Sequence, residues 1–254
     1  MAPSDILATF DPVFLDEMEN AKLMNRIDTK YLAPAHRLEE LLKLSLNDYR
    51  VLEIDGKRMM EYSTSYFDTP DSEMFYDHQR GKKSRQKIRI RRYEDSGGLA
   101  FLEVKDKNNK GRTVKTRKKM GKETGIRDYA AFIDENSNFD VSCLANNIDN
   151  RFHRITLVRR DMSERVTIDT DVCFHNQQTG KDASVSQLVI IEWKRKALSE
   201  YSPMRAILKK LGIRESGFSK YCVGIILTNP EIRHNRHKPR IRTINKLSKQ
   251  LQDG

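Results

Sequence analysis

The sequence predicts an α+β fold in which helices flank an antiparallel β-sheet or barrel. Between residues 57 and 196, many short segments alternate apolar and polar residues, which is typical of strands with one buried face. Turn-forming sequences join several of these segments into hairpins, and there is no regular alternation of strands and long helices to indicate a parallel sheet. Helical periodicity is confined to a few short segments.

The first expected elements are two helices separated by an extended segment. We predict a helix over residues 10–23, with Pro12 at an early helical position. Residues 26–33 are predicted to be extended. Residues 34–46 are predicted to form the second helix, because their leucines recur at spacings of three and four residues, which places them on one helix face.

Strands dominate the middle of the chain. We expect them over residues 57–67, 85–93, 99–105, 112–118, 151–160, 164–169 and 187–196. The sequence Asp-Ser-Gly-Gly at residues 95–98 predicts one hairpin turn, and Asn-Asn-Lys-Gly at residues 108–111 predicts another. A turn or short helix is expected over residues 71–78, and a helix over residues 127–136.

The last part of the chain is predicted to contain a helix, a strand and a basic tail. The helix begins at Ser202, whose side chain suits the N-cap position, and ends at Gly212. Residues 223–227 are apolar and are expected to form a late strand. Because the sequence after residue 230 is basic with little apolar content, we divide the chain into a domain over residues 1–230 and a mobile tail over residues 231–254.

Composition indicates an anionic partner. The 47 Lys and Arg residues outnumber the 36 Asp and Glu residues, and the net charge is +11. The three cysteines match neither a disulfide framework nor a zinc-binding spacing, which favours a reducing compartment. The N-terminus lacks a signal-peptide pattern, and no stretch approaches the ~20 apolar residues of a membrane helix. We therefore expect a cytoplasmic protein.

The predicted strands separate charged from apolar side chains. Over residues 85–93, alternation places Arg89 and Arg91 on one face, with Ile88 and Ile90 on the other. The same alternation assigns four more side chains to the charged faces of their strands: Lys105, Lys115, Arg165 and Glu192.

A sheet with one solvated side would explain any single strand of this kind. Five strands share the pattern, however, and their polar faces are heavily cationic with a few carboxylates. In a closed barrel these faces would meet across a lumen. A triphosphate or polyphosphate chain, together with a divalent metal on a carboxylate, would neutralise such a lumen.

Eight segments of the sequence together resemble the VTC domain, the polyphosphate polymerase branch of the CYTH-like triphosphate tunnel metalloenzymes. They are RIDTKYL (26–32), YFDTP (66–70), IRIRRY (88–93), FLEVK (101–105), VKTRK (114–118), ERVTIDTD (164–171), IEWK (191–194) and SKYCVGI (219–225). The resemblance covers about residues 10–228 in order. It implies an eight-stranded antiparallel β-barrel tunnel with flanking helices.

The resemblance also implies roles for individual residues. Phosphate binding is implied for Lys30, Arg89, Arg91, Lys105, Lys115, Arg154, Arg165, Ser219 and Lys220. Those counted as catalytic are Arg89, Arg91, Lys105, Lys115, Arg154, Arg165 and Glu192. Glu192 is the implied ligand of Mn²⁺ or Mg²⁺. The positions of Lys30, Arg154 and Lys220 follow from the resemblance alone.

The chain departs from the wider superfamily near its first strand. Hydrolases and cyclases of that superfamily usually begin with E-x-E-x-K, whereas this chain has Arg26 and Asp28 at the two acidic positions and keeps Lys30. Fewer metal ligands and more positive charge suit a site that holds long phosphate chains, which is closer to the VTC branch.

The expected function is therefore that of a polyphosphate polymerase. It would transfer the γ-phosphate of ATP, or of another triphosphate, to a growing inorganic polyphosphate chain. The nucleophile is already an anion, so no strong general base is needed. A triphosphatase of the same fold would need a base for water. Glu103 is a candidate, but we interpret it as a partner of neighbouring cations.

Other functions stay open at this level. A non-catalytic protein that binds polyphosphate or triphosphate is one alternative, and a nucleic-acid-binding module is another. We expect no nucleic acid, because Tyr93 and Phe101 are the exceptions on charged faces that otherwise carry almost no aromatic residues for base stacking. A membrane partner protein that draws the product away is left open.

The remaining polar residues are assigned structural roles. His78, His153 and His175 show no metal-binding spacing and are expected at the surface or in the core. Cys222 is expected to be a small buried residue. Asp169 is interpreted as the hydrogen-bond partner of a tunnel arginine rather than as a second metal ligand.

Overall fold

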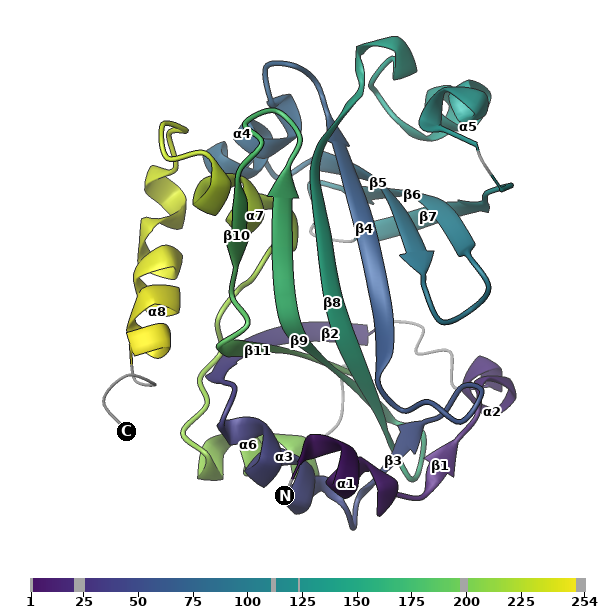
Figure 1. Cartoon of the computed structure of the whole chain (residues 1–254), viewed down its shortest axis with the longest axis vertical. Helices are drawn as coiled ribbons and strands as arrows, with labels where there is room; N and C mark the ends of the chain where they lie inside the picture. Colours follow the sequence, from purple (N-terminus) through teal and green to yellow (C-terminus); the bar gives the residue numbers. More distant parts are fainter. Residues whose placement is uncertain (1, 21–25, 111–112, 123, 197–200, 250–254) are drawn as a thin grey trace.

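The computed structural model describes residues 2–20, 26–110, 113–122, 124–196 and 201–249. It confirms the predicted α+β class, because one large, mostly antiparallel sheet forms the centre and helices flank it (Figure 1). The long strands β4, β8 and β9 lie side by side, and β5, β6 and β7 continue the sheet in a different direction, so the sheet is strongly curved (Figure 1).

Eight strands form the main path of the sheet. Their order is β2-β11-β9-β8-β4-β5-β6-β7, and each is antiparallel to its neighbours. Their bounds are β2 Arg26–Pro34, β4 Met60–Asp68, β5 Arg85–Tyr93, β6 Leu99–Lys107, β7 Thr113–Lys119, β8 Ala145–Arg159, β9 Glu164–Asn176 and β11 Leu188–Lys196. Three short strands join at the margins: β1 Pro12–Val13, β3 Tyr49–Leu52 and β10 Asp182–Ser184.

The expected barrel needs a correction, although the eight-stranded antiparallel path agrees with the expectation. Strands β2 and β7 are the two ends of the path, and within the described residues no backbone pairing joins them. Most of β7 is exposed, including Val114 at 54%. Alternating Lys and Arg side chains keep this edge strand in water, as charged side chains commonly do on free sheet edges. The sheet is therefore curved and open.

The helices are short. Their bounds are α1 Pro3–Ala8, α2 Leu15–Asn20, α3 Arg37–Ser45, α4 Glu73–Arg80, α5 Ala130–Asn136, α6 Pro203–Lys210, α7 Lys220–Thr228 and α8 Lys238–Lys249. Single 3₁₀ turns cover Ile126–Tyr129, Val141–Cys143 and Asn235–His237. The leucine face of α3 is buried as its spacing predicts, and the Ser202 hydroxyl accepts a hydrogen bond from the Arg205 N–H at 3.3 Å at the start of α6.

Two predicted elements differ in type in the structure. The segment expected as one helix over residues 10–23 contains β1 and α2 instead, because Val13 is fully buried and β1 pairs with β3; residues 21–25 lie outside the described part. The predicted strand at residues 223–227 is wrong, since these residues belong to α7. An apolar run without periodicity does not distinguish a helix from a strand, and the Ser219 hydroxyl caps the helix by accepting from the Cys222 N–H at 3.3 Å.

The segment after residue 230 also contains regular structure. Helix α8 lies beside the sheet, against β2 and β11, and buries Ile244 to 2% exposure (Figure 1). The expected lack of structure there was inferred from low apolar content, but Ile241, Ile244 and Leu247 recur every three residues on α8 and pack against the apolar core. The division of the chain at residue 230 remains a proposal.

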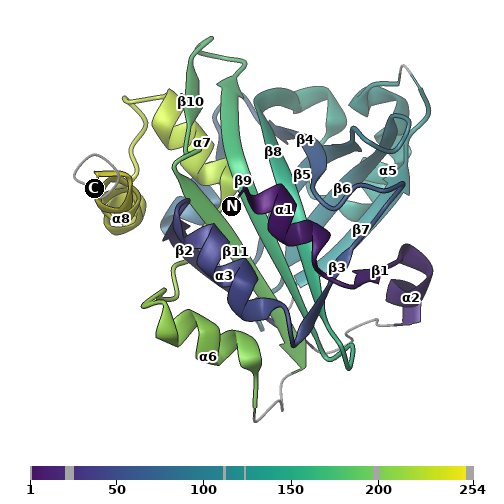
Figure 2. The same cartoon turned by 60° about the horizontal axis from the view of Figure 1, so that its bottom comes forward.

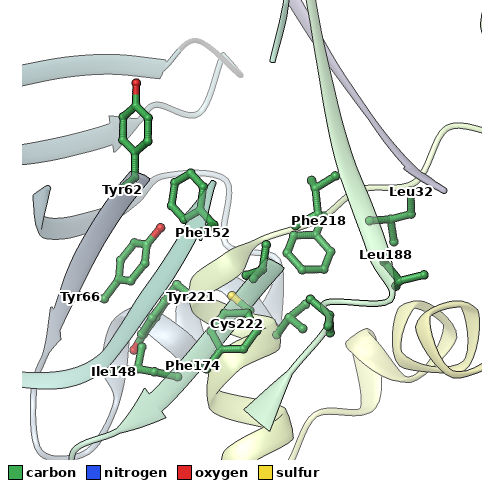
Figure 3. Close-up of a cluster of buried hydrophobic side chains, with 14 of the residues drawn as sticks. Leu32, Tyr62, Tyr66, Ile148, Phe152, Phe174, Leu188, Phe218, Tyr221 and Cys222 are labelled. Carbon is green, nitrogen blue, oxygen red and sulfur yellow. The ribbon is translucent and has the colours of Figure 1, made fainter. Parts of the chain in front are cut away.

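Apolar side chains form separate clusters on the two faces of the sheet. Helices α1, α3 and α6 cover one face of β8, β9 and β11 (Figure 2), where Trp193 and Leu41 are buried. On the other side of the same strands, α7 packs on β8 and β9, and Cys222 and Tyr221 lie among the rings of Phe152 and Phe174 (Figure 3). Within the described residues, no helix is long and apolar enough to cross a bilayer.

Candidate functional site

The registers of the eight strands bring the predicted charges to one face of the sheet. Arg89 lies opposite Glu103, and Lys105 lies opposite both Lys87 and Lys115. At the other end, Glu192 lies opposite Lys30. We call this surface the charged face and define it by Lys30, Lys87, Arg89, Arg91, Glu103, Lys105, Lys115, Arg154, Arg165, Asp169, Glu192 and Lys194.

Glu103 neutralises two cations in the middle of the β5–β6–β7 sheet. Its Oε2 accepts from Nε and Nη2 of Arg89 at 2.7 and 2.5 Å, and its Oε1 accepts from Lys115 Nζ at 2.9 Å. Glu103 is fully buried. Burial alone would raise the pKa of its carboxyl, but the charges of Arg89, Arg91 and Lys115 outweigh burial and hold that pKa well below its ordinary value. Glu103 is thus a partner of cations, as interpreted from the sequence.

Asp169 plays the same part on β9. Its two oxygens accept from Nε and Nη2 of Arg154 at 2.6 and 2.9 Å, and Lys220 at the start of α7 also donates to it. Burial opposes ionisation of Asp169, but Arg154 and Lys220 keep the pKa of its carboxyl well below the ordinary range. The interpretation of Asp169 as an arginine partner agrees with this geometry.

Glu192 on β11 lies between two lysines. Its Oε1 is 3.3 Å from Lys30 Nζ, and its Oε2 accepts from Lys194 Nζ. Burial would raise the pKa of Glu192, but Lys194 and Lys30 lower it well below the ordinary value, so the group is an anion at neutral pH. A carboxylate of this kind suits a hard divalent cation, and Asp28 lies on the same face of the neighbouring strand, opposite Lys194.

Arg91 and Lys105 are two cations of this face that form no ion pair with a carboxylate among the described residues, and Lys87, which donates to the Ser219 hydroxyl, is a third. Within the described residues, Arg91 contacts the Thr64 hydroxyl at 3.5 Å and forms no ion pair, and Lys105 forms neither a hydrogen bond nor an ion pair. Burial and the charges of Arg89 and Arg154 lower the pKa of Arg91 to about 10. The pKa of Lys105 is lowered well below its ordinary value by the charge of Arg89, by burial and by the charge of Arg91. This part of the face carries excess positive charge.

Aromatic rings support the arginines. The Tyr62 and Phe152 rings stack with centroids 5.4 Å apart (Figure 3), and the Arg91 and Arg154 guanidinium groups lie 5.2–5.9 Å from those two rings. The Tyr66 hydroxyl accepts a hydrogen bond from Arg89 Nη1 at 3.4 Å. The face is therefore richer in aromatic residues than the sequence indicated, but Tyr62, Tyr66 and Phe152 are buried and offer no open platform for a base.

Tyr66 and Lys220, which contact Arg89 and Asp169 of the charged face, each have a pKa near 8. Burial opposes ionisation of Tyr66, but the charges of Arg89, Arg91 and Lys220 lower the pKa of its hydroxyl to about 8. Burial lowers the pKa of Lys220 to about 8, assisted by Arg154 and opposed by Asp169. The face therefore gains negative charge or loses positive charge when pH rises through 8.

The other predicted residues lie on or beside the charged face. Ser219 caps α7, and its hydroxyl accepts from Lys87 Nζ at 3.1 Å. Arg165 lies opposite Lys194 in the β9–β11 register and is partly buried. The roles predicted for all of these residues remain proposals; the structure brings their positions to one face.

Four residues of this site were missed as site residues by sequence reasoning. Lys87 and Lys194 share a strand face with predicted residues, so alternation alone could have found them. Tyr62 and Tyr66 lie on a predicted strand whose face was not assigned, and only the pairing of β4 with β5 places Thr64 and Tyr66 opposite Arg91 and Arg89.

Comparisons with known proteins identify one matching family. The family model described as the VTC domain matches residues 25–229. None of the curated proteins matches this sequence. Among solved structures, an adenylate cyclase-like protein from Bacillus halodurans is similar, with 15% identity, a TM-score of 0.48, and coverage of 77% of this chain and 96% of that chain. A Hippeastrum protein described as an adenylyl cyclase with dominant triphosphatase activity has 15% identity, a TM-score of 0.43, and coverage of 79% and 94%.

Proposed function

Because the chain belongs to the VTC domain family, we propose that it is a polyphosphate polymerase that takes phosphate from ATP. The charged face binds the triphosphate of ATP together with the end of an inorganic polyphosphate chain. The observation that carries the proposal is a group of cations on one face without an ion-pair partner, among them Arg91 and Lys105. Their lowered pKa values reflect crowding by other cations, and a polyphosphate supplies the negative charge that would offset it.

The phosphate-binding side chains have different roles. Arg91 and Lys105, which no carboxylate pairs with, bind phosphate groups of the ligand. Arg89 and Arg154 are held in place by Glu103 and Asp169, so they present their remaining N–H groups in fixed directions. Lys87, Ser219 and Lys220 add donors at the start of α7.

The reaction is a transfer between two phosphate oxygens. A terminal oxygen of the polyphosphate forms a bond to the γ-phosphorus of ATP. The bond from that phosphorus to the β–γ bridging oxygen breaks, and ADP leaves with the electron pair. Positioning and charge neutralisation by Arg89, Arg91 and Lys105 supply the catalysis, because the nucleophile is already an anion.

Glu192 would hold a divalent metal, with Asp28 on the adjacent strand as a further oxygen ligand. The two oxygens of Glu192 contact lysines, and carboxylate oxygens are ligands that Mg²⁺ and Mn²⁺ prefer. When bound, the ion would supply positive charge that offsets the negative charge of the transition state.

The carboxylates favour transfer over hydrolysis. Every carboxylate oxygen of Glu103, Asp169 and Glu192 accepts a hydrogen bond from, or pairs with, a cation. Their lowered pKa values make them weak bases for activating water. A triphosphatase is therefore the second candidate, and a binding protein without activity is the third.

One assay separates these functions. The purified chain is incubated with ATP and Mn²⁺, and ADP, orthophosphate and chain length are measured, the last on a gel. A polymerase produces ADP and long polyphosphate, whereas a triphosphatase produces ADP and orthophosphate. A chain that binds tripolyphosphate but turns over no ATP would be a binding protein without activity. Binding of RNA without tripolyphosphate binding would contradict all three functions.

The cytoplasmic location and a membrane partner that receives the product belong to the same proposal.

A further inference from the structure

Three side chains that can ligate metals converge behind the start of α7. They are His78 on α4, Cys222 on α7 and His237 on the 3₁₀ turn before α8, and one ligand atom from each lies within 4.8 Å of the others. The histidines are 159 positions apart in the chain, so sequence spacing could not reveal the group. The Cys222 sulfur lies within the apolar cluster of α7, beside Tyr221 (Figure 3).

The two imidazoles are left with unpartnered nitrogens. Within the described residues, His78 Nδ1 and His237 Nε2 are buried and have no hydrogen-bond partner. His237 is only 2% exposed, and its ring stacks on that of His78 with centroids 5.4 Å apart. Native proteins rarely bury polar nitrogens in this way, and one common explanation is a bound ion.

Both histidines are neutral at physiological pH. Burial, with Lys87 and Arg85, lowers the pKa of His78 to about 2. Burial, with Arg240 and Lys87, lowers that of His237 to about 4. Neutral imidazole is the form that binds metals. The surrounding cations oppose a divalent ion, but a metal-bound Cys222 thiolate would carry negative charge, and Lys87 and Arg240 interact electrostatically with Cys222.

We propose that His78, Cys222 and His237 form a zinc site, with water or an exogenous ligand in the fourth position. Two imidazoles and one thiolate are the nitrogen and sulfur ligands that Zn²⁺ takes, whereas Mg²⁺ and Mn²⁺ prefer oxygen. The site is therefore chemically distinct from the oxygen ligands at Glu192. It goes beyond the proposed polymerase function and does not depend on it.

The contact of Arg240 on α8 with His237 opposes zinc binding at this site. Arg240 Nη1 lies 2.9 Å from His237 Nδ1 and donates to that nitrogen. When Nε2 of His237 binds zinc, Nδ1 carries the proton, so two donors face each other and the Arg240 guanidinium has to move away. Replacing Arg240 with Gln supplies an acceptor for the Nδ1 proton, a contact that commonly strengthens a metal-bound histidine.

Zinc would join the C-terminal segment to the charged face. The site connects α4 and α7 to the turn that leads into α8. Helix α7 begins at Ser219 and Lys220, which contact Lys87 and Asp169 of the charged face. A bound ion would therefore hold the start of α7 in place and resist separation of α8 from the sheet.

The test uses the full chain after treatment with a chelator. Zn²⁺ and Co²⁺ are titrated separately, and metal content, the cobalt–thiolate absorption and the thermal midpoint of unfolding are measured. We expect one ion per chain, the thiolate band with Co²⁺, and a higher midpoint with Zn²⁺. The Cys222→Ser variant should lose the thiolate band, and His78→Asn should bind Zn²⁺ at least tenfold more weakly. Arg240→Gln should bind Zn²⁺ more tightly than the unmodified chain.

The controls are the exposed Cys173 and the half-buried His153, which lie outside the group, and the variants Cys173→Ser and His153→Gln should behave as the unmodified chain. His78 is only partly buried, so its variant tests the site even if Cys222→Ser folds poorly. Failure of the unmodified chain to bind Zn²⁺ stoichiometrically would overturn the proposal. So would a cobalt–thiolate band that survives in Cys222→Ser, or affinity that is unchanged in His78→Asn.

Discussion

Arg89 and Glu103 form a buried ion pair in which two guanidinium nitrogens, Nε and Nη2, donate to a single carboxylate oxygen. The second oxygen of Glu103 is thereby left to Lys115 at 2.9 Å. Glu103 on β6 therefore compensates one cation on each of the two strands beside it. Neither of its oxygens remains for Arg91 or Lys105. This local imbalance makes the charged face a candidate for polyanion binding.

Removal of the Glu103 charge should destabilise the fold. In Glu103→Gln, Arg89 loses its buried counter-ion, which is expected to lower the free energy of unfolding by about 3–5 kcal/mol at neutral pH. The exposed pair of Arg37 and Glu40 provides the control, because Glu40→Gln should cost at most about 1 kcal/mol. Urea denaturation measures both.

The cost of Glu103→Gln should depend on pH. The folded-state pKa of Glu103 is below its unfolded value, so its stabilisation is complete above the unfolded pKa, near 4.3, and is lost as pH falls below that value toward the folded pKa. The difference in the free energy of unfolding between the unmodified chain and Glu103→Gln should therefore shrink as pH falls. A difference that stays constant down to acid pH would contradict the assignment of this carboxylate as the buried counter-ion.

Arg91 should contribute to ligand binding at the expense of stability. In Arg91→Gln, tripolyphosphate should bind about 10- to 100-fold more weakly, the equivalent of about 1.5–3 kcal/mol for hydrogen bonds to a charged group. The free energy of unfolding without ligand should stay equal or rise, because a partly buried cation beside Arg89 and Arg154 is removed. Calorimetry and urea denaturation measure the two effects.

Arg92 is the matched control for Arg91. It is the next residue on β5, points to the opposite face and hydrogen-bonds to Ser65. The Arg92→Gln variant should retain tripolyphosphate affinity within about twofold, since its effect is limited to long-range charge. Equal losses in both variants would mean that net charge, and not the charged face, determines binding.

Tripolyphosphate affinity should fall as pH rises through 8. Lys220 loses its positive charge and Tyr66 gains a negative charge near this pH, and both changes oppose anion binding. The double variant Lys220→Arg with Tyr66→Phe removes both titrations. Its affinity relative to the unmodified chain should therefore increase between about pH 7 and pH 9. The comparison cancels the ionisation of the ligand itself, and a constant ratio would refute the assignment.

Glu192 should be needed for turnover more than for binding. In Glu192→Gln, phosphate transfer with Mn²⁺ should fall about 100-fold or more, because several kcal/mol of transition-state stabilisation by the metal is lost. Tripolyphosphate affinity measured in chelator should be unchanged or higher, because a negative charge has been removed. Reduced affinity in chelator would indicate that Glu192 only positions Lys30 and Lys194.

Strand patterns were predictable where one face is apolar and the other charged. Residues 85–93 form β5 with the bounds that the sequence predicts, and the alternation correctly placed Arg89 and Arg91 on the face opposite Ile88. Elements without such contrast were not predictable. Residues 223–227 are uniformly apolar, and their helical state follows from the cap at Ser219 and packing against Phe174 and Ile148.

The alternation of charged and apolar residues already determined the fold class and the charged side of five strands, because side-chain direction alternates with a period of two. Only the tertiary structure decided which charges compensate each other, since strand pairing brings Glu103 to Arg89 and Lys115 and leaves Arg91 and Lys105 alone. It also decided that His78, Cys222 and His237 meet, because these residues belong to separate helical segments whose contact depends on packing and not on spacing.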